Sequence, residues 1–187
     1  ARILREAHTE TCRAIRAGEP MTPEAEWLLD NFHVVEEQLR EIVDDLPERF
    51  YRELPKIESG EPRVYVLAIE LLVHTDSSLD EDTIARCVHA FQESAPLSIG
   101  ETWAFPIMLR LGLVENLRRL AAQMLLRRQH REQACRILDE WKTDSDFPID
   151  AIGSERCNAL ILHLVEELQK RGVLSVSGLN ALERQLA

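Results

Sequence analysis

Glycine and aromatic residues are scarce in this sequence, which has seven glycines and 5% aromatic residues among its 187 positions. So few glycines leave no glycine-rich loop of the kind that binds phosphate groups. The hydrophobic fraction of 45% is ordinary for a globular protein and argues against disorder. The composition therefore predicts a folded chain with few turns, and it disfavours an all-β fold.

The cysteines are few and far apart in the sequence. No two of them form a Cys-x-x-Cys pair, which excludes the usual zinc-knuckle and thioredoxin motifs. Each lies among apolar residues in a helical pattern, so we interpret them as reduced, buried thiols of an intracellular protein. The four are Cys12, Cys87, Cys135 and Cys157.

Long hydrophobic runs are missing as well. A membrane-spanning helix needs about 20 consecutive apolar residues, and Glu70 and Arg110 interrupt the two best candidates. No signal-peptide pattern opens the chain. The first residue is Ala1 rather than methionine, and a helical pattern starts at once. We therefore expect a fragment of a longer protein.

Negative charge is abundant and unevenly distributed. The formal net charge of -11 disfavours nucleic acid, because binding phosphates requires a cationic surface. Aspartate and glutamate dominate residues 24–61, whereas residues 110–136 are rich in arginine. This arginine-rich segment is either an ordinary solvated face or a docking surface for another protein or domain.

Apolar residues recur at helical spacing along most of the chain. Thr22 and Asp80 are suitable N-cap residues, Pro23 fits the first position of a helix, and Ser98 with Glu101 forms a capping box. Residues 47–62 break the pattern and are predicted to form a structured loop. The expected helices cover about residues 2–17, 23–45, 63–74, 81–95, 99–128, 131–142, 154–171 and 179–186.

No convincing strand accompanies these helices. The predicted fold class is therefore all-α, an irregular bundle or solenoid-like stack of about eight helices. Residues 1–187 are expected to form a single helical domain. The helix beginning near Ser98 is expected to kink at Pro106, where proline removes a backbone hydrogen bond.

The acidic and histidine residues do not form a recognisable catalytic or metal-binding motif. Asp30 with His33, and Glu70 with His74, are incomplete as ligand sets for a carboxylate-bridged metal pair. The Asp-x-Asp patterns at 80–82 and 144–146 would need a nucleotide-binding sheet beside them, and none is predicted. We therefore expect no catalytic residue, no metal and no cofactor within this segment.

The aromatic residues are the remaining candidates for binding. Tryptophan at helical spacing from aliphatic residues usually packs in a core, and this is the expected place of Trp27, Trp103 and Trp141. Aromatic rings also stack on sugar rings. Tyr51, in the predicted loop, and Trp103, in a first helical turn, are the best candidates for such a contact.

Four sequence blocks carry a family resemblance. They read TPEAEWLLDNFHVVEEQLREI, LPERFYRELPKI, PRVYVLAIELLVHTDSSLD and LSIGETWAFPIMLRLGLVENLRRLA. Together they span about residues 20–125. In order and spacing, these blocks resemble the N-terminal region of the bacterial cyclic β-1,2-glucan synthases.

The resemblance implies a role in a large inner-membrane protein. Members of this family combine a glucosyltransferase domain that uses UDP-glucose and a divalent cation, membrane-spanning segments, and a phosphorylase-like domain that trims the glucan. The catalytic residues belong to parts of the family that do not match this chain. The chain is thus expected to be a non-catalytic helical module on the cytoplasmic side of the inner membrane, packing on other domains of the same polypeptide or on the glucan.

This hypothesis assigns the likeliest contacts to five residues, Tyr51, Arg52, Glu53, Glu101 and Trp103. An alternative is a helical adaptor that binds another protein through a face including Arg110, Arg118 and Arg119. A third possibility is a small metalloenzyme that uses His33 and His74.

Overall fold

The computed structural model describes residues 1–140 and 158–170. In these residues the regular elements are all helices, with one isolated bridge between Lys56 and Pro62. The predicted fold class, all-α, is therefore confirmed. The last predicted helix, 179–186, lies outside the described residues, as do Trp141, Cys157 and the Asp-x-Asp pattern at 144–146. The helices are α1 (Arg2–Arg16), α2 (Pro23–Asp45), α3 (Glu48–Glu53), α4 (Arg63–His74), α5 (Glu81–Ser94), α6 (Ile99–Glu140) and α7 (Asn158–Lys170).

The predicted helix starts are confirmed by hydrogen bonds. The Thr22 side chain accepts from the Ala25 amide at the start of α2, where Pro23 occupies the first position. The Asp80 carboxylate accepts from the Thr83 amide at 2.8 Å at the start of α5. In each case a side-chain oxygen satisfies an amide that the helix itself leaves without a partner.

The structure corrects two of the predicted helix assignments. Residues 48–53 form the short helix α3 rather than part of a loop. The break predicted between residues 128 and 131 is absent, because α6 continues without interruption from Ile99 to Glu140, with Pro106 inside it. None of the helices in the described ranges has the combination of length and apolar character that crossing a membrane requires.

The chain divides into two compact units, Ala1–Ala122 and Gln123–Ala187. We call them unit 1 and unit 2. Helix α6 contributes its first part to unit 1 and its second part to unit 2. A single helical domain over the whole chain stays a prediction.

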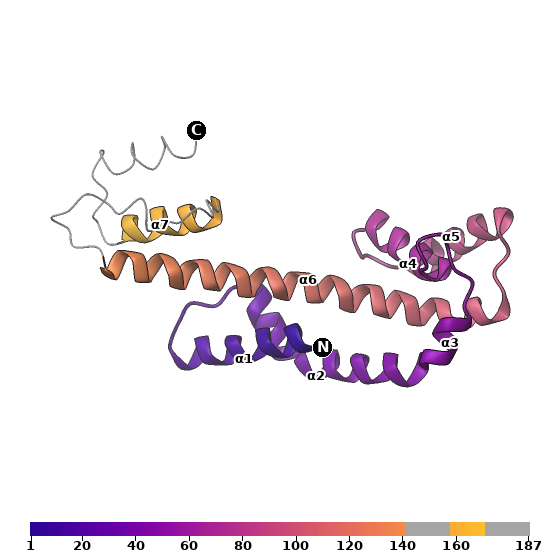
Figure 1. Cartoon of the computed structure of the whole chain (residues 1–187), viewed down its shortest axis with the longest axis horizontal. Helices are drawn as coiled ribbons and strands as arrows, with labels where there is room; N and C mark the ends of the chain where they lie inside the picture. The colour runs from indigo at the N-terminus through magenta and orange to yellow at the C-terminus, as the bar shows by residue number, and fades with distance from the viewer. Residues whose placement is uncertain (141–157, 171–187) are drawn as a thin grey trace. The chain divides into compact units, whose positions relative to one another are not determined.

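The core of unit 1 forms where α4 packs on the first part of α6. In Figure 1, α4 and α5 lie on one side of this part of α6, and α1, α2 and α3 lie on the other. The two helices approach closely at Gly112, because a Cβ atom there would lie 2.5 Å from Leu72 Cδ1. The buried residues of this core are Leu54, Val64, Ala68, Leu71, Leu72, Ala104, Phe105, Met108 and Leu109.

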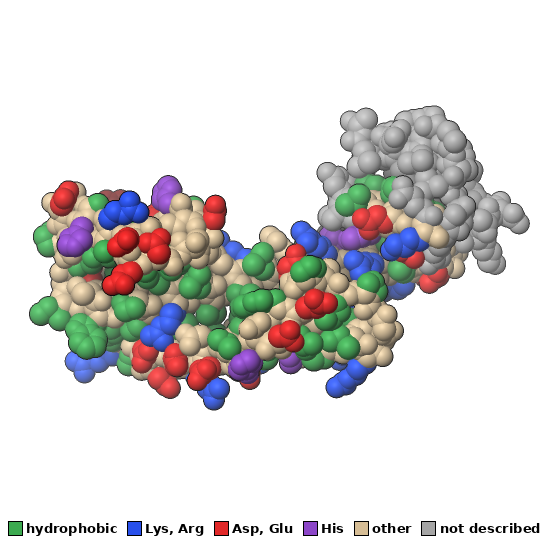
Figure 2. Space-filling model, turned by 180° about the vertical axis from the view of Figure 1, so that it is seen from behind, with side chains coloured by type: hydrophobic (Ala, Val, Ile, Leu, Met, Phe, Trp, Pro, Cys, Tyr) green, Lys and Arg blue, Asp and Glu red, His purple; other side chains and the backbone are tan. Residues whose placement is uncertain are grey.

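Helices α1 and α2 pack together on the other side of α6. The His8 and Phe32 rings stack with centroids 4.0 Å apart, and Arg5 lies 3.3 Å from Glu36. From α6, Arg110 reaches the carboxylates of Glu41 and Asp45 near the C-terminal end of α2. Figure 2 shows acidic side chains gathered along the edge of unit 1 that α2 occupies.

In unit 2, the last part of α6 packs against α7. Its core is aliphatic: Ala134, Ile137 and Leu138 come from α6, and the other members are Leu160, Ile161, Leu164 and Leu168 from α7. Leu164 has no exposed surface at all. On the opposite side of α7, Leu162 is 58% exposed.

Candidate functional site at the start of α6

The first turn of α6 is fixed by the predicted capping box. The Ser98 amide donates to Glu101 Oε2 at 2.9 Å, and the Glu101 amide donates to Ser98 Oγ at 3.3 Å. The Ser98 hydroxyl also lies 2.9 Å from the same carboxylate oxygen. These reciprocal bonds hold the backbone of the first turn in one conformation.

The Glu101 carboxylate also binds Arg63, the first residue of α4. Arg63 Nη2 donates to Glu101 Oε2 at 2.8 Å, and Nε donates to the other carboxylate oxygen. Arg63 Nη2 also donates to the Pro96 carbonyl at 2.7 Å, and its guanidinium carbon lies 5.8 Å from the centre of the Phe91 ring. One guanidinium therefore joins the start of α4, the segment after α5 and the start of α6.

Burial and charge explain the ionisation of this pair. Glu101 is fully buried, whereas the Arg63 side chain is 26% exposed. The hydrogen bond from Arg63, supported by those from Ser98, lowers the pKa of Glu101 to about 2, although burial acts in the opposite direction. The same bond raises the pKa of Arg63. Both groups are therefore charged at neutral pH, and their polar atoms are used inside the unit.

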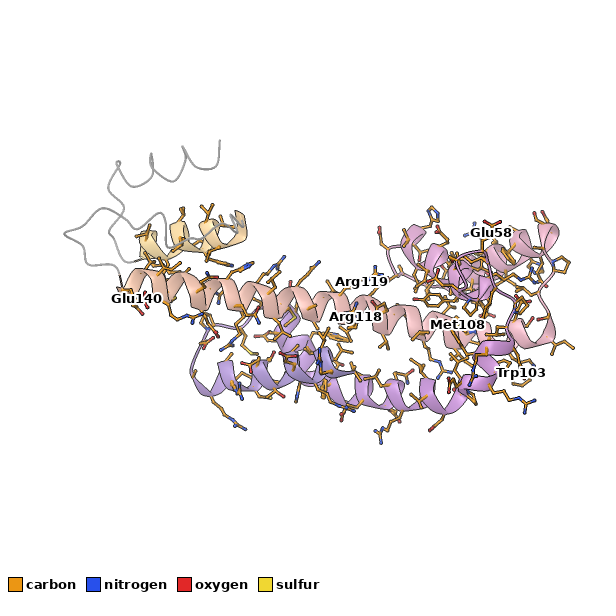
Figure 3. The ribbon with its side chains drawn as sticks, viewed as in Figure 1. Glu58, Trp103, Met108, Arg118, Arg119 and Glu140 are labelled. Carbon is orange, nitrogen blue, oxygen red and sulfur yellow. The ribbon has the colours of Figure 1, made fainter. Side chains whose placement is uncertain are left out.

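The outer face of the same helical segment is apolar and exposed. Ile99 is 81% exposed and Trp103 is 74% exposed, whereas Ala104 and Met108 are completely buried on the other side of the helix. Figure 3 shows Trp103 projecting from the N-terminal part of α6, near α3. A rigid backbone thus presents two large apolar side chains to solvent within one turn of the helix.

The expected core position of the tryptophans is therefore wrong where the structure describes them. Trp27 is 51% exposed, in addition to the exposed Trp103. The pattern of aliphatic neighbours misled the prediction, because α2 and α6 each carry apolar residues on more than one face. Helical spacing alone does not state which face is covered.

The candidate contacts on α3 differ among themselves. Tyr51 is partly buried and packs against the core of unit 1, so its ring holds α3 in place. Arg52 and Glu53 are exposed, and each lies in an ion pair within α3, Arg52 with Glu48 and Glu53 with Arg49. Phe50 of α3 reaches the first turn of α6 next to Gly100. The structure thus brings α3 next to the start of α6.

Of the five candidate contact residues, Glu101 alone is fully buried. Because it is fully buried, it can affect a contact surface only through the backbone that it holds. The sequence did not reveal its partner, Arg63. The only signal was a basic residue at the start of a predicted helix, and nothing in the sequence connects it with a carboxylate 38 positions away.

The three arginines proposed as a docking face are engaged with carboxylates. Arg110 binds Glu41 at 3.0 Å and Asp45 at 2.8 Å, both on α2. Arg118 binds Glu115 with two hydrogen bonds of 2.6 and 2.7 Å, and Arg119 lies 3.5 Å from the same carboxylate. Among these, Arg119 is the most exposed, at 65% of its side chain.

The histidines of the metalloenzyme alternative lie apart from any ligand cluster in the described residues. His74 is 3.6 Å from Glu70, and both side chains are largely exposed. Within residues 1–140 and 158–170, no group of three histidine, cysteine, aspartate or glutamate side chains is placed to hold a metal ion. Asp80 of the first Asp-x-Asp pattern is the N-cap of α5.

Comparison with known proteins places the chain in a family. No protein-family model matches it. It is 36% identical, over 99% of its length, to the cyclic β-(1,2)-glucan synthase NdvB of Rhizobium meliloti (strain 1021). The chain spans only 8% of the length of that protein. The resemblance in the four sequence blocks is thus confirmed, and the chain belongs, as a segment, to the cyclic β-(1,2)-glucan synthase family.

Proposed function

We propose that this chain is a non-catalytic helical module of a cyclic β-(1,2)-glucan synthase, and that it positions the catalytic parts of the enzyme or the growing glucan. The similarity to such a synthase over nearly the whole chain supports the role in glucan synthesis. The observation that carries the positioning role is the Ile99–Trp103 surface, exposed on a turn that buried Glu101 makes rigid. A preorganised apolar surface loses little freedom on binding.

In this proposal the reaction takes place elsewhere in the enzyme. The parent protein would use UDP-glucose and a divalent cation, and it would reside in the inner membrane with this module on the cytoplasmic side. The described polar groups fit a structural role, since Arg63 binds Glu101, Arg110 binds α2, and Glu115 binds Arg118 within α6. The partners would be other domains of the same polypeptide.

A chromosomal substitution in the source organism tests this function. We expect Trp103→Ala to reduce cyclic glucan synthesis while leaving the amount of the protein unchanged, because the indole is exposed and contributes little to folding. Trp103→Phe should retain part of the synthesis. Val43→Ala, on the 71% exposed side chain of α2, is the matched control. Unchanged synthesis with Trp103→Ala would contradict the proposal.

A narrower form of the proposal is that Trp103 stacks on the glucan. An exposed indole offers an apolar face and a hydrogen-bond donor, which suits a sugar ring. Tyr51 is the less suitable partner, because its ring packs against the core. Isothermal titration with linear β-1,2-glucan should give heat with the native chain and none with Trp103→Ala, with Tyr51→Phe as the control. Absence of heat with the native chain would contradict this narrower form.

The exposure of Arg119 favours a second candidate function, a helical adaptor that binds an acidic protein surface. Charge reversal at Arg118 and Arg119 should then abolish capture of that partner in a pull-down. Glu115→Gln is the control, since it frees both arginines and should strengthen capture. A yield that does not respond to either change would remove this candidate.

A further inference from the structure

Exposed apolar side chains repeat every seven residues along the part of α6 that belongs to unit 1. Ile99, Pro106, Leu113 and Leu120 are all exposed, with exposed fractions of 81% for Ile99, 37% for Leu113 and 53% for Leu120. Seven residues are close to two turns of an α-helix, so the four side chains lie in one stripe along the helix. Trp103 extends the stripe, four residues after Ile99 and three before Pro106.

We call these five residues the exposed seam of α6. The opposite face of the same helix is already covered, since Ala104 and Met108 have no exposed surface and pack towards α4. Unit 1 thus covers this part of α6 with α4 on one side and with α1, α2 and α3 on the other, and the five seam residues remain exposed. From Ile99 to Pro106 the seam advances by four and then three residues, the spacing by which one helix packs on another at a shallow angle, and beyond Pro106 it advances by seven.

We propose that the exposed seam is the docking site for an amphipathic helix with basic flanking residues, supplied from outside residues 1–187. From Ile99 to Leu120 the seam is about 30 Å long, at 1.5 Å per residue, which matches a helix of about 20 residues. A partner helix with apolar residues at alternating steps of three and four would insert its side chains between those of the seam.

The charge beside the seam supports a basic flank at the end of the partner helix that lies over Arg110. At the other end, beside Leu120, Arg118 and Arg119 share the single carboxylate of Glu115. Arg110 lies between Pro106 and Leu113, and its guanidinium is bound by both Glu41 and Asp45, which leaves an excess negative charge. The surrounding part of α2 and α3 is strongly acidic, with only Arg40 and Arg49 of opposite sign between residues 37 and 49. The other acidic residues there are Glu37, Asp44 and Glu48.

The source of the helix rests on the proposed function. The chain spans 8% of the length of its relative, and the helix would come from the remaining part of such a polypeptide. The seam itself does not depend on that function, because it follows from the exposure and spacing of residues on α6.

Photo-crosslinking in cells that contain the whole protein tests the proposal. A benzophenone amino acid replaces Leu113 or Leu120, one at a time, and the adducts are mapped by mass spectrometry. We expect both positions to crosslink to a single segment, at sites about seven residues apart, in a sequence with apolar residues at helical spacing and flanking lysine or arginine. Matched controls at Val73 and Leu162, which are 64% and 58% exposed but lie on α4 and α7, should give little adduct.

Several results would overturn the proposal. They are the absence of adducts at the seam, equal yields at the control positions, adducts to separate segments, and adducts to residues 1–187 of the same or a second copy. Leu120→Glu provides an independent check, because a charge in the seam should lower the crosslinking yield from position 113. Circular dichroism of each variant, with a helical content equal to that of the native protein, establishes that the substitution has not unfolded the chain.

The outcome is separate from that of the proposed function. Crosslinks with the expected seven-residue register, together with normal glucan synthesis by Trp103→Ala, would support the seam and contradict the positioning role. Reduced synthesis by Trp103→Ala without crosslinks from positions 113 and 120 would support the positioning role and contradict the seam.

Discussion

The α4–α6 contact of unit 1 and the α6–α7 contact of unit 2 hold their helices together in different ways. Both bury aliphatic side chains. In the described residues, only the α4–α6 contact adds a buried ion pair, Arg63 with Glu101. Aliphatic packing supplies most of the free energy of folding but tolerates small shifts between helices, whereas a bidentate ion pair has one geometry. The comparison suggests that Glu101 specifies how α6 begins, and that the aliphatic residues make the contact stable.

The largest expected effect comes from breaking the aliphatic contact of unit 2. Leu164→Ala should destabilise the α6–α7 contact by about 3 kcal/mol, because it leaves a cavity at a fully buried position. Hydrogen exchange measured by mass spectrometry should accelerate in α7 and leave α4 unchanged. Leu162→Ala, on the exposed side of α7, should change the free energy by less than about 0.5 kcal/mol. Equal effects of the two substitutions would contradict the core described for unit 2.

Removing one member of the ion pair should have a comparable but smaller effect on unit 1. Glu101→Ala should destabilise the α4–α6 contact by about 3 kcal/mol at most, since Arg63 loses its partner but keeps some contact with solvent. The double substitution Arg63→Met with Glu101→Leu should cost less than Glu101→Ala, because no charge is then left unpaired. Chemical denaturation of these variants and of Glu58→Ala, on an exposed residue, would measure the difference.

The same pair predicts a pH dependence. The pKa of Glu101 is lowered to about 2 in the folded chain, so its stabilising contribution is complete above the ordinary carboxyl pKa and is lost as the pH falls from about 4.5 towards 2. The difference in the free energy of unfolding between the native chain and Glu101→Gln should therefore shrink over this range. A difference that stays constant with pH would show that the carboxylate charge is not what stabilises the contact.

A smaller effect is expected where α4 and α6 approach most closely. Gly112→Ala should destabilise unit 1 by about 1 to 2 kcal/mol, because the added methyl group would overlap Leu72, and the better helix propensity of alanine offsets only part of this. Gly100→Ala is the matched control. A Cβ atom there would lie 3.6 Å from Phe50, an ordinary contact, so this change should stabilise the helix slightly. Thermal denaturation should move in opposite directions for the two variants.

The smallest effect is expected at the start of α5, a helix with no fully buried residue. Asp80→Ala removes the N-cap and should increase hydrogen exchange in α5 a few-fold, with little change in α4 or α7. Asp80→Asn keeps an oxygen acceptor and should behave nearly as the native chain does. Exchange in α4 that rose as much as in α5 would mean that the two helices open together.

Local signals in the sequence were enough for most of the helix boundaries in unit 1. Thr22 and Asp80 accept the predicted amides, and Ser98 and Glu101 form the predicted capping box. Helix α3 was missed because prolines on both sides and a length of six residues leave too little periodicity to detect. The break predicted after Arg128 was wrong because the polar residues around it, mostly arginine, glutamine and glutamate, favour helix.

The sequence by itself determined the all-α class and the caps, because propensity and capping depend on residues close together in the chain. It also determined the relationship to a glucan synthase, because similarity compares residue types in order. Only the tertiary structure decided that Glu101 is buried beside Arg63 while Trp103, two positions later, faces solvent. The physical reason is that a helix with apolar residues on several faces does not specify which face is covered. That choice depends on where α4 meets α6. The ion pair between them joins Arg63 to Glu101, which is 38 positions later in the sequence.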